Sequence, residues 1–334
     1  MTAYGLQLPN FSSGKVSDEE LFEHVASLAS AGQVGGFSSV WVMDHCLPLP
    51  DLGGADRPLF EPYTLLGALA ARTSTVRLGA LVSGVTYRHP SILAKQATTL
   101  DVISGGRAIL GIGADWYDPE HRASGIDFPP AGERLARLEE ADRLEELDHL
   151  EWLDRLEEAV QICRAMFTQD NPTFQGRYYA IDDARNLPRP VQAGGVPILI
   201  GGSDPRRTLL LVARWADACN VTGPGEQVRD SLAILDRHCQ DVGRDPAQVR
   251  RTWLGSLFVC PSRSQADALR SELVQAVGPE AVAAMVIGDE GEVAQVVQSL
   301  AAEGLDELIF NLPEASGPPD VIATGQVLGA ALLT

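Results

Sequence analysis

Residues 76–113 read VRLGALVSGVTYRHPSILAKQATTLDVISGGRAILGIG. A strand-like apolar run at 76–82 is followed by a helical pattern at 90–103 and by a second apolar run at 107–112. A helix between two such runs returns the chain to the same edge of a sheet, so the two strands are parallel. The stretch therefore predicts a parallel sheet covered by helices.

The same alternation recurs along the chain. The strand-like runs lie at 3–8, 38–43, 76–82, 107–112, 197–200, 217–221, 252–259 and 306–310. The helical patterns lie at 18–33, 61–72, 90–103, 132–167, 204–215, 226–243, 263–276, 290–303 and 321–332. Eight such units predict an α/β fold, the (β/α)8 TIM barrel, and we expect a single domain over residues 1–334.

The ends of the strands favour the barrel over a doubly wound sheet. Polar and glycine residues follow many different strands, at Pro9-Asn10, Asp44-His45, Ser83-Gly84, Gly111-Ile112-Gly113, Gly201-Gly202-Ser203, Thr222-Gly223 and Asn311. A barrel collects its active site from the carboxyl ends of many strands, whereas a doubly wound sheet concentrates its site at one switch point.

The sequence GIGADW at 111–116 follows a strand but is not a dinucleotide-binding fingerprint. The third glycine of GxGxxG is absent, and Pro119 stands where the helix of that fingerprint runs. We interpret these glycines as positions where a flat ring approaches the backbone closely.

Composition excludes several classes of protein. Lys and Arg number 26 against 45 Asp and Glu, so the net charge of −19 repels nucleic acid and anionic lipid. No apolar run is long enough to cross a bilayer, and the first residues lack the pattern of a signal peptide. Five dispersed cysteines indicate reduced thiols in the cytoplasm, and the histidine spacing indicates no metal site.

At this point the sequence resembles a known family, the bacterial luciferase-like flavin and deazaflavin oxidoreductases, and within it the branch that uses coenzyme F420. The resemblance covers nearly the whole chain. It is carried by YGLQLPNF at 4–11, SVWVMDH at 39–45, the stretch 63–116, PILIGGSDPRRTLLLVARWADACNVTG at 197–223 and ELIFNLP at 307–313.

The resemblance implies that a flavin or deazaflavin ring lies across the carboxyl ends of the strands. Gly201, Gly202 and Ser203 are expected to surround the cofactor phosphate, because backbone N–H groups and a helix that starts near Asp204 would face an anion. Thr222 and Gly223 would complete this cradle. The alternative is an ordinary turn between strand and helix.

The resemblance also places a bulge with a non-proline cis peptide at Leu81-Val82, behind the ring, which it would bow. The remaining cofactor contacts that it implies are at Ser83, Gly113, Ala114 and Asn220.

His45 and Asp44 are the candidate catalytic residues. An imidazole at a strand end could protonate the substrate atom that does not receive the hydride, or it could only form a hydrogen bond to cofactor or substrate. In the sugar-phosphate and alcohol dehydrogenases of the family, a tryptophan aligns with Leu49, and a catalytic glutamate of the sugar-phosphate enzyme aligns with Trp116. Both departures argue against a sugar-phosphate substrate.

Some nearby residues keep two interpretations. Asp115 either adds an acid to the pocket or turns outward as a cap. Trp116, Tyr117, Tyr87 and Trp41 either line the cofactor site or pack in the core.

RLEEA occurs at 137–141 and again at 155–159, so residues 141–158 read as an insertion. Its length is five whole helical turns, which preserves the phase of a continuous helix. Its leucines recur every third residue, and we expect them, with Trp152, to be buried against another surface, first of all a dimer partner. Prolines and glycines at 168–196 predict an irregular excursion before the fifth strand.

Three functions remain in competition. The first is an F420-dependent oxidoreductase that transfers a hydride between the deazaflavin and a small organic substrate with a C=O, C=N or activated C=C bond. The second is a monooxygenase that uses reduced FMN and O2. The third is a non-enzymatic relative that keeps only the fold. The expected partners are a small-molecule substrate and a second copy of the chain, with no nucleic acid and no membrane.

Overall fold

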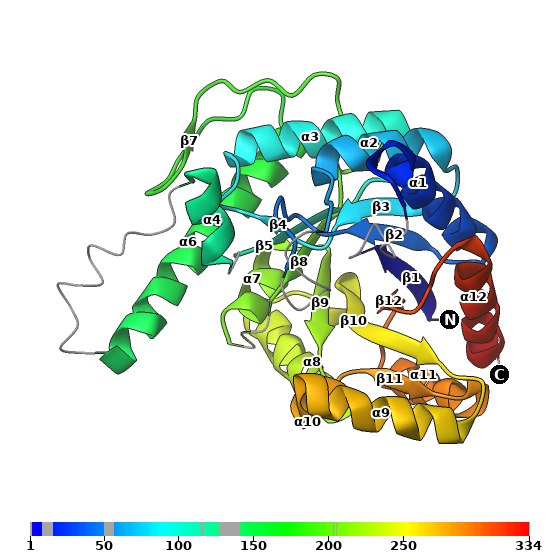
Figure 1. Ribbon diagram of the computed structural model, residues 1–334. Coiled ribbons are helices and arrows are strands. Elements are labelled where there is room, and N and C mark those ends of the chain that lie inside the picture. The colour runs from blue at the N-terminus through cyan, green and yellow to red at the C-terminus, as the bar shows by residue number, and fades with distance from the viewer. Residues whose placement is uncertain are drawn as a thin grey trace.

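The strands of the computed structural model form a nearly closed parallel barrel that is surrounded by helices (Figure 1). The structure describes residues 2–8, 16–49, 57–114, 117–126, 141–202, 204 and 206–333, and for 141–151 it describes the backbone alone. The first three staves of the barrel are β1 (Ala3–Leu8), β2 (Ser39–Val42) and the pair β3 (Arg77–Ala80) and β4 (Ser83–Gly84). The others are β5 (Leu110–Gly113), β8 (Ile198–Gly201), β9 (Ala218–Thr222), β10 (Arg250–Val259) and β12 (Glu307–Asn311).

The barrel closes through its third strand position, which is divided into the two short strands β3 and β4. The path of paired strands runs β3-β2-β1-β12-β10-β9-β8-β5-β4, so its two ends are separated in sequence only by Leu81 and Val82. The peptide bond between these two residues is cis, as the family resemblance implies. Leu78 also bridges to Ala108 next to β5. The predicted (β/α)8 barrel and all its eight strands are confirmed in the described part of the chain.

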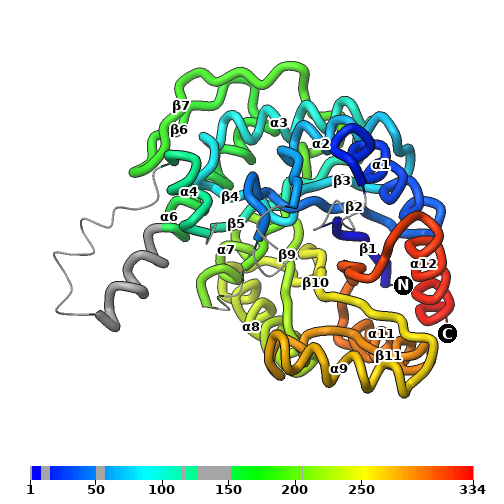
Figure 2. The backbone as a smooth tube through the Cα atoms, viewed as in Figure 1, coloured from blue at the N-terminus to red at the C-terminus, as the bar shows by residue number. Residues whose placement is uncertain are grey.

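Helices cover the outside of the barrel. They are α1 (Asp18–Val34), α2 (Pro62–Arg72), α3 (Pro90–Ser104), α4 (Asp118–Ser124), α6 (Ala141–Thr168), α7 (Thr208–Trp215), α8 (Gly225–Asp241), α9 (Arg263–Val277), α10 (Pro279–Ala283), α11 (Glu290–Ala302) and α12 (Pro318–Leu333). The first and last of them, α1 and α12, pack side by side (Figure 2). None of the described helices has the length and apolar character that a bilayer span requires.

Alternation along the strands separates two cores. Strand residues such as Val40, Leu110 and Ile200 point outward and pack with the buried faces of the helices. A smaller inner cluster fills the barrel, and it consists of Trp41, Leu81, Ile109, Leu199, Ala218 and Ile309, with Val82 and Leu254 packed against it. This plug forms the floor of the barrel mouth.

The excursion at 168–196 and two other segments differ in detail from the sequence patterns. The excursion contains a small hairpin of β6 (Phe174–Gln175) and β7 (Ala180–Ile181). The short strand β11 (Val286–Gly288) pairs with the end of β10 and was not predicted. The helix expected from near Asp204 is α7, which begins at Thr208. Asp204 lies just before it: its side chain accepts hydrogen bonds from the backbone N–H groups of Arg206 and Arg207, and its carbonyl oxygen accepts from Thr208.

The segment 141–158 is helical as predicted, and it forms the first part of α6. Trp152, Leu153 and Leu156 are 8%, 3% and 0% exposed, so they are buried within this chain. For Leu153 and Leu156 the expected dimer partner is wrong, because both pack in the outer core of this chain. The side chains of Leu144, Leu147 and Leu150 lie outside the described residues.

We expect Gly111→Ala to destabilise the barrel, because a Cβ there would lie 2.1 Å from the carbonyl oxygen of Ala80. The cost should be about 1–3 kcal/mol in the free energy of unfolding. Gly67→Ala in α2 is the matched control, because nothing lies within 4 Å of its added Cβ, and it should stabilise by ~0.5–1 kcal/mol. Urea denaturation of both variants measures this, and equal effects would contradict the packing at Gly111.

Candidate active site

Val82 lies at the centre of the barrel mouth. A Cβ on Gly113 would lie 2.5 Å from one methyl group of Val82, and a Cβ on Gly201 would lie 2.8 Å from the other. Gly113 and Gly201, at the ends of β5 and β8, thus make room for the side chain of Val82. The close approach of a ring to the glycines at 111–113 stays a prediction. Val82 itself is partly exposed, so it offers an apolar platform to a flat ligand.

Polar side chains lie beside this platform. Gln7 and Asn311 pair in register on β1 and β12, and both occupy inward positions, because their neighbours Leu6 and Phe310 point into the outer core. Gln7 donates a hydrogen bond to the carbonyl oxygen of Leu81. The buried Oδ1 of Asn311 accepts no hydrogen bond from the described residues. This acceptor suits a ligand that carries an N–H group, such as the pyrimidinedione of a flavin or deazaflavin.

The expected phosphate cradle comes together at one edge. β8 pairs in parallel with β9, with Gly201 opposite Asn220, so the ends of both strands lie at the same edge of the barrel mouth. A phosphate site formed by Gly201, Gly202, Thr222 and Gly223 stays a prediction. Gly202 and Thr222 are exposed, and Gly223 has φ +95°, a backbone conformation that favours glycine. The helix α8 starts two residues later with no side-chain cap, which leaves backbone N–H groups for an anion. Ser203 lies outside the described residues.

Other predicted cofactor residues are engaged within the protein. The Ser83 hydroxyl forms a 2.7 Å hydrogen bond with Tyr63 on α2, and Asn220 donates to the buried Thr252. Ala114 packs against the outer core, and the Gly113 carbonyl accepts from Val85. Their roles in cofactor binding stay predictions.

His45 follows β2 and is paired with a carboxylate that the sequence did not reveal. Its Nδ1 lies 2.8 Å from Oε2 of Glu120, which is fully buried on α4. The other oxygen of Glu120 accepts from the backbone N–H groups of Cys46 and Leu47. Burial would raise the pKa of Glu120, but hydrogen bonds from His45, Cys46 and Tyr87 outweigh it, and the net pKa is lowered.

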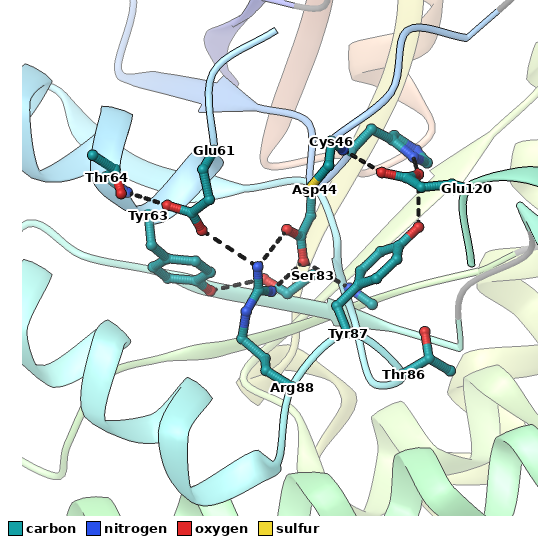
Figure 3. A network of polar contacts seen from close by, with 12 residues as sticks. Asp44, Cys46, Glu61, Tyr63, Thr64, Ser83, Thr86, Tyr87, Arg88 and Glu120 are labelled. Atoms are coloured by element: carbon teal, nitrogen blue, oxygen red, sulfur yellow. Dashed lines mark hydrogen bonds and ion pairs between the residues drawn. The ribbon is translucent and has the colours of Figure 1, made fainter. Parts of the chain in front are cut away.

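Tyr87 connects this pair to a second layer. Its hydroxyl donates to Oε2 of Glu120 at 2.7 Å (Figure 3), and its ring stacks on His121 at 4.6 Å between centroids. His121 is fully buried between Thr86 and the carbonyl oxygen of Tyr117. Sequence reasoning missed α4 because Pro119 was taken to stop a helix, whereas proline is accepted in the first turn.

Asp44 is held by Arg88 rather than directed at a substrate. The guanidinium forms a two-pronged ion pair with the carboxylate, with N–O distances of 2.5 and 2.9 Å (Figure 3). The backbone N–H of Gly84 also donates to this carboxylate. Burial lowers the pKa of Arg88, but the hydrogen bond and the charge of Asp44 outweigh this and raise it overall. The pair therefore stays charged and ties the end of β2 to β4. A catalytic role for Asp44 stays a prediction.

Cys46 is exposed beside His45, yet it is not poised as a nucleophile. Partial burial and the charges of Glu120 and Asp44 raise the pKa of its thiol. No group of three or more His, Cys, Asp or Glu side chains in the described ranges is arranged to hold a metal ion.

Comparison with known proteins gives one family. The model of the luciferase-like monooxygenases matches residues 2–310. An F420-dependent glucose-6-phosphate dehydrogenase of Kineococcus radiotolerans is 28% identical, over 93% of this chain and 90% of that protein. The corresponding enzyme of Amycolatopsis mediterranei is 34% identical, but the match covers 54% of this chain and 46% of that protein.

Solved structures share the fold. An F420-dependent secondary alcohol dehydrogenase, in complex with an F420-acetone adduct, superposes with a TM-score of 0.76 at 18% identity over 99% of both chains. The monooxygenase RslO1 of Streptomyces bottropensis gives a TM-score of 0.75 at 22% identity, again over 99% of both chains. These structural neighbours show that the chain shares their fold.

We expect the stability that Glu120 contributes to be lost in acid. Because its pKa is lowered on folding, the contribution is complete above its ordinary value of 4.5 and disappears as the pH falls through the lower folded value. Glu120→Gln should cost ~1–3 kcal/mol at pH 7, and the difference from the parent should shrink below pH ~4.5. Denaturant titrations at both pH values measure this, with the exposed Glu272→Gln on α9 as control. A difference that does not change with pH would contradict the ionised state of Glu120.

Proposed function

The chain belongs to the luciferase-like monooxygenase family, and from this premise we propose that it is an F420-dependent oxidoreductase. It transfers a hydride between the deazaflavin and a small organic substrate that carries a C=O, C=N or activated C=C bond. The observation that carries the proposal is the His45–Glu120 pair at a strand end of the same barrel mouth as the Val82 platform.

In this proposal, different residues of the barrel mouth contact the ring and the phosphate of the cofactor. Val82 supports one face of the ring, with the cis peptide at Leu81-Val82 behind it. Gly201, Gly202, Thr222 and Gly223, together with Ser203, surround the phosphate. We also assign cofactor contacts to four residues that the family resemblance implies, which are Ser83, Gly113, Ala114 and Asn220. Asn311 accepts a hydrogen bond from the ring edge, which its unsatisfied Oδ1 supports.

A bound deazaflavin supplies or accepts the hydride, and His45 moves the proton. When a carbonyl is reduced, the hydride goes to the carbon and a proton from Nε2 of His45 goes to the oxygen. In the reverse direction, neutral His45 accepts the hydroxyl proton while the hydride leaves the carbon. Asp44 supports this by holding the segment that carries His45, through its ion pair with Arg88.

We propose that the substrate is not a sugar phosphate. A relative that matches over 93% of this chain is named a glucose-6-phosphate dehydrogenase, but Leu49 and Trp116 stand where such enzymes carry a tryptophan and a glutamate. Leu49 is 9% exposed, so this position contributes apolar packing instead of an indole N–H. A smaller or less polar substrate fits these replacements.

A flavin monooxygenase is the alternative function. It is favoured by structural neighbours such as RslO1, which is named a monooxygenase. The two functions differ in oxygen dependence, because reduced FMN forms an oxygen adduct and the deazaflavin does not.

We also propose a cytoplasmic homodimer. The free state of Cys46, Cys163, Cys219, Cys239 and Cys260 is compatible with a reducing compartment. Light scattering of the purified chain tests the oligomeric state.

Cofactor titration with a charge reversal tests the cradle. We expect F420 to bind the parent and FMN to bind weakly, and Gly202→Glu should weaken F420 binding at least ~10-fold, because a carboxylate then faces the phosphate. Gly202→Gln is the matched control of equal bulk and should lose much less. Fluorescence titration measures all three proteins. Equal losses would contradict a phosphate at Gly202, and tight FMN binding with O2 consumption would favour the monooxygenase.

His45→Ala should lower turnover by roughly 10²–10⁴, because a general acid is lost. F420 affinity should change only a few-fold. The assay follows F420 absorbance with a panel of secondary alcohols, ketones and enones, and with glucose 6-phosphate for comparison. Weakened cofactor binding at unchanged turnover would instead assign His45 a binding role.

A further inference from the structure

The side chain of Glu120 meets hydrogen-bond donors at both of its oxygens. Oε2 receives the Tyr87 hydroxyl and faces Nδ1 of His45, while Oε1 receives the N–H groups of Cys46 and Leu47. An ionised carboxylate is acceptor-only, so it can satisfy two donors at each oxygen. Since Glu120 is 0% exposed, these four groups replace water around its charge.

This arrangement has a consequence for the imidazole. A carboxylate oxygen that already accepts from Tyr87 and carries no proton attracts a proton on the nitrogen that faces it. Neutral His45 is therefore held with its hydrogen on Nδ1, and all proton exchange with a bound molecule must run through Nε2.

The contacts of Glu120 also fix the position of the ring. Glu120 reaches His45 across 75 positions of sequence, and it binds the two backbone N–H groups that follow His45. Tyr87 is in turn fixed by its stacking on His121. The segment after β2 therefore cannot move away from α4 without exposing or orphaning a buried charge.

The charged groups around His45 and Glu120 do not change the expected position of the proton on Nδ1 of His45. Asp44 precedes His45 in sequence, but its charge is compensated by Arg88, which also contacts Glu61. His121 contacts Thr86 and the Tyr117 carbonyl, and the ring of Tyr117 meets that of His45 edge-on at 6.1 Å. The carboxylate of Glu120 thus faces Nδ1 of His45 at 2.8 Å.

We propose that Glu120 is a positioning residue that fixes His45 as the Nδ1–H tautomer and so makes Nε2 its working nitrogen. This inference rests on the proposed function only for the use of Nε2. The tautomer itself is a property of the protein without substrate or cofactor, so its failure can be told apart from failure of the proposed function.

The experiment is ¹⁵N NMR of the imidazoles in the full chain, at a pH where His45 is neutral. His45→Gln identifies the signals of His45 by their loss. In the parent, Nδ1 should give the shift of a protonated ring nitrogen and Nε2 that of an unprotonated one. A parent in which His45 carries its proton on Nε2 would overturn the proposal without any further variant.

Glu120→Gln is the decisive variant. An amide has one oxygen, so either His45 and Tyr87 or the two backbone N–H groups must then face its NH2 group. We expect the ratio of Nδ1–H to Nε2–H forms to fall by about 10- to 100-fold, the factor of one charge-assisted hydrogen bond. An unchanged ratio would contradict the proposal.

Two further variants separate positioning from folding. Tyr87→Phe removes one donor but keeps the ring against His121, so the tautomer should remain that of the parent. Glu120→Asp keeps the charge on a shorter side chain and should recover part of the ratio and of kcat, with KM close to the parent. If both Glu120→Asp and Glu120→Gln lower kcat and raise KM while the tautomer of His45 is unchanged, Glu120 has only a structural role.

Discussion

The shape of the barrel mouth depends on the inward position of one side chain, that of Val82. The third stave breaks between β3 and β4, and the broken part turns Val82 onto the inner core. The inward positions of β5 and β8 are glycines at this height, because a Cβ there would overlap Val82 or the carbonyl oxygen of Ala80. The platform for a flat ligand and the closure of the sheet thus have the same steric origin.

Two buried carboxylates then hold His45 beside this platform. Asp44 ties the end of β2 to Arg88 and to the N–H of Gly84, and Glu120 ties the next residues to α4. Each charge is satisfied by several donors, which is the condition under which a buried carboxylate holds structure in place. His45 lies between these two anchors, so its ring is held by hydrogen bonds among three segments that are distant in sequence: 44–47, 84–88 and α4.

Arg88 has a structural role beside the barrel mouth. Arg88 is half of a buried ion pair, and its guanidinium also lies 5.2 Å from the centre of the Tyr63 ring. Burial and the charge of Asp44 raise the pKa of Tyr63, so its hydroxyl stays protonated and holds Ser83. The Ser83 hydroxyl on β4 is therefore engaged with Tyr63 on α2, whereas Val82, which precedes β4, lies partly exposed against the inner core.

The sequence by itself determined the barrel, because period-two apolar runs and helical patterns are local properties of the chain. It also placed His45, Gly201, Gly202, Thr222 and Gly223 at the carboxyl ends of strands, since that end is fixed by chain direction. Only the tertiary structure decided which groups meet: Glu120 and Arg88 join His45 and Asp44 across 75 and 44 positions. Such pairs have no local signal, because the hydrogen bonds that satisfy a buried charge depend on three-dimensional packing and not on spacing in sequence.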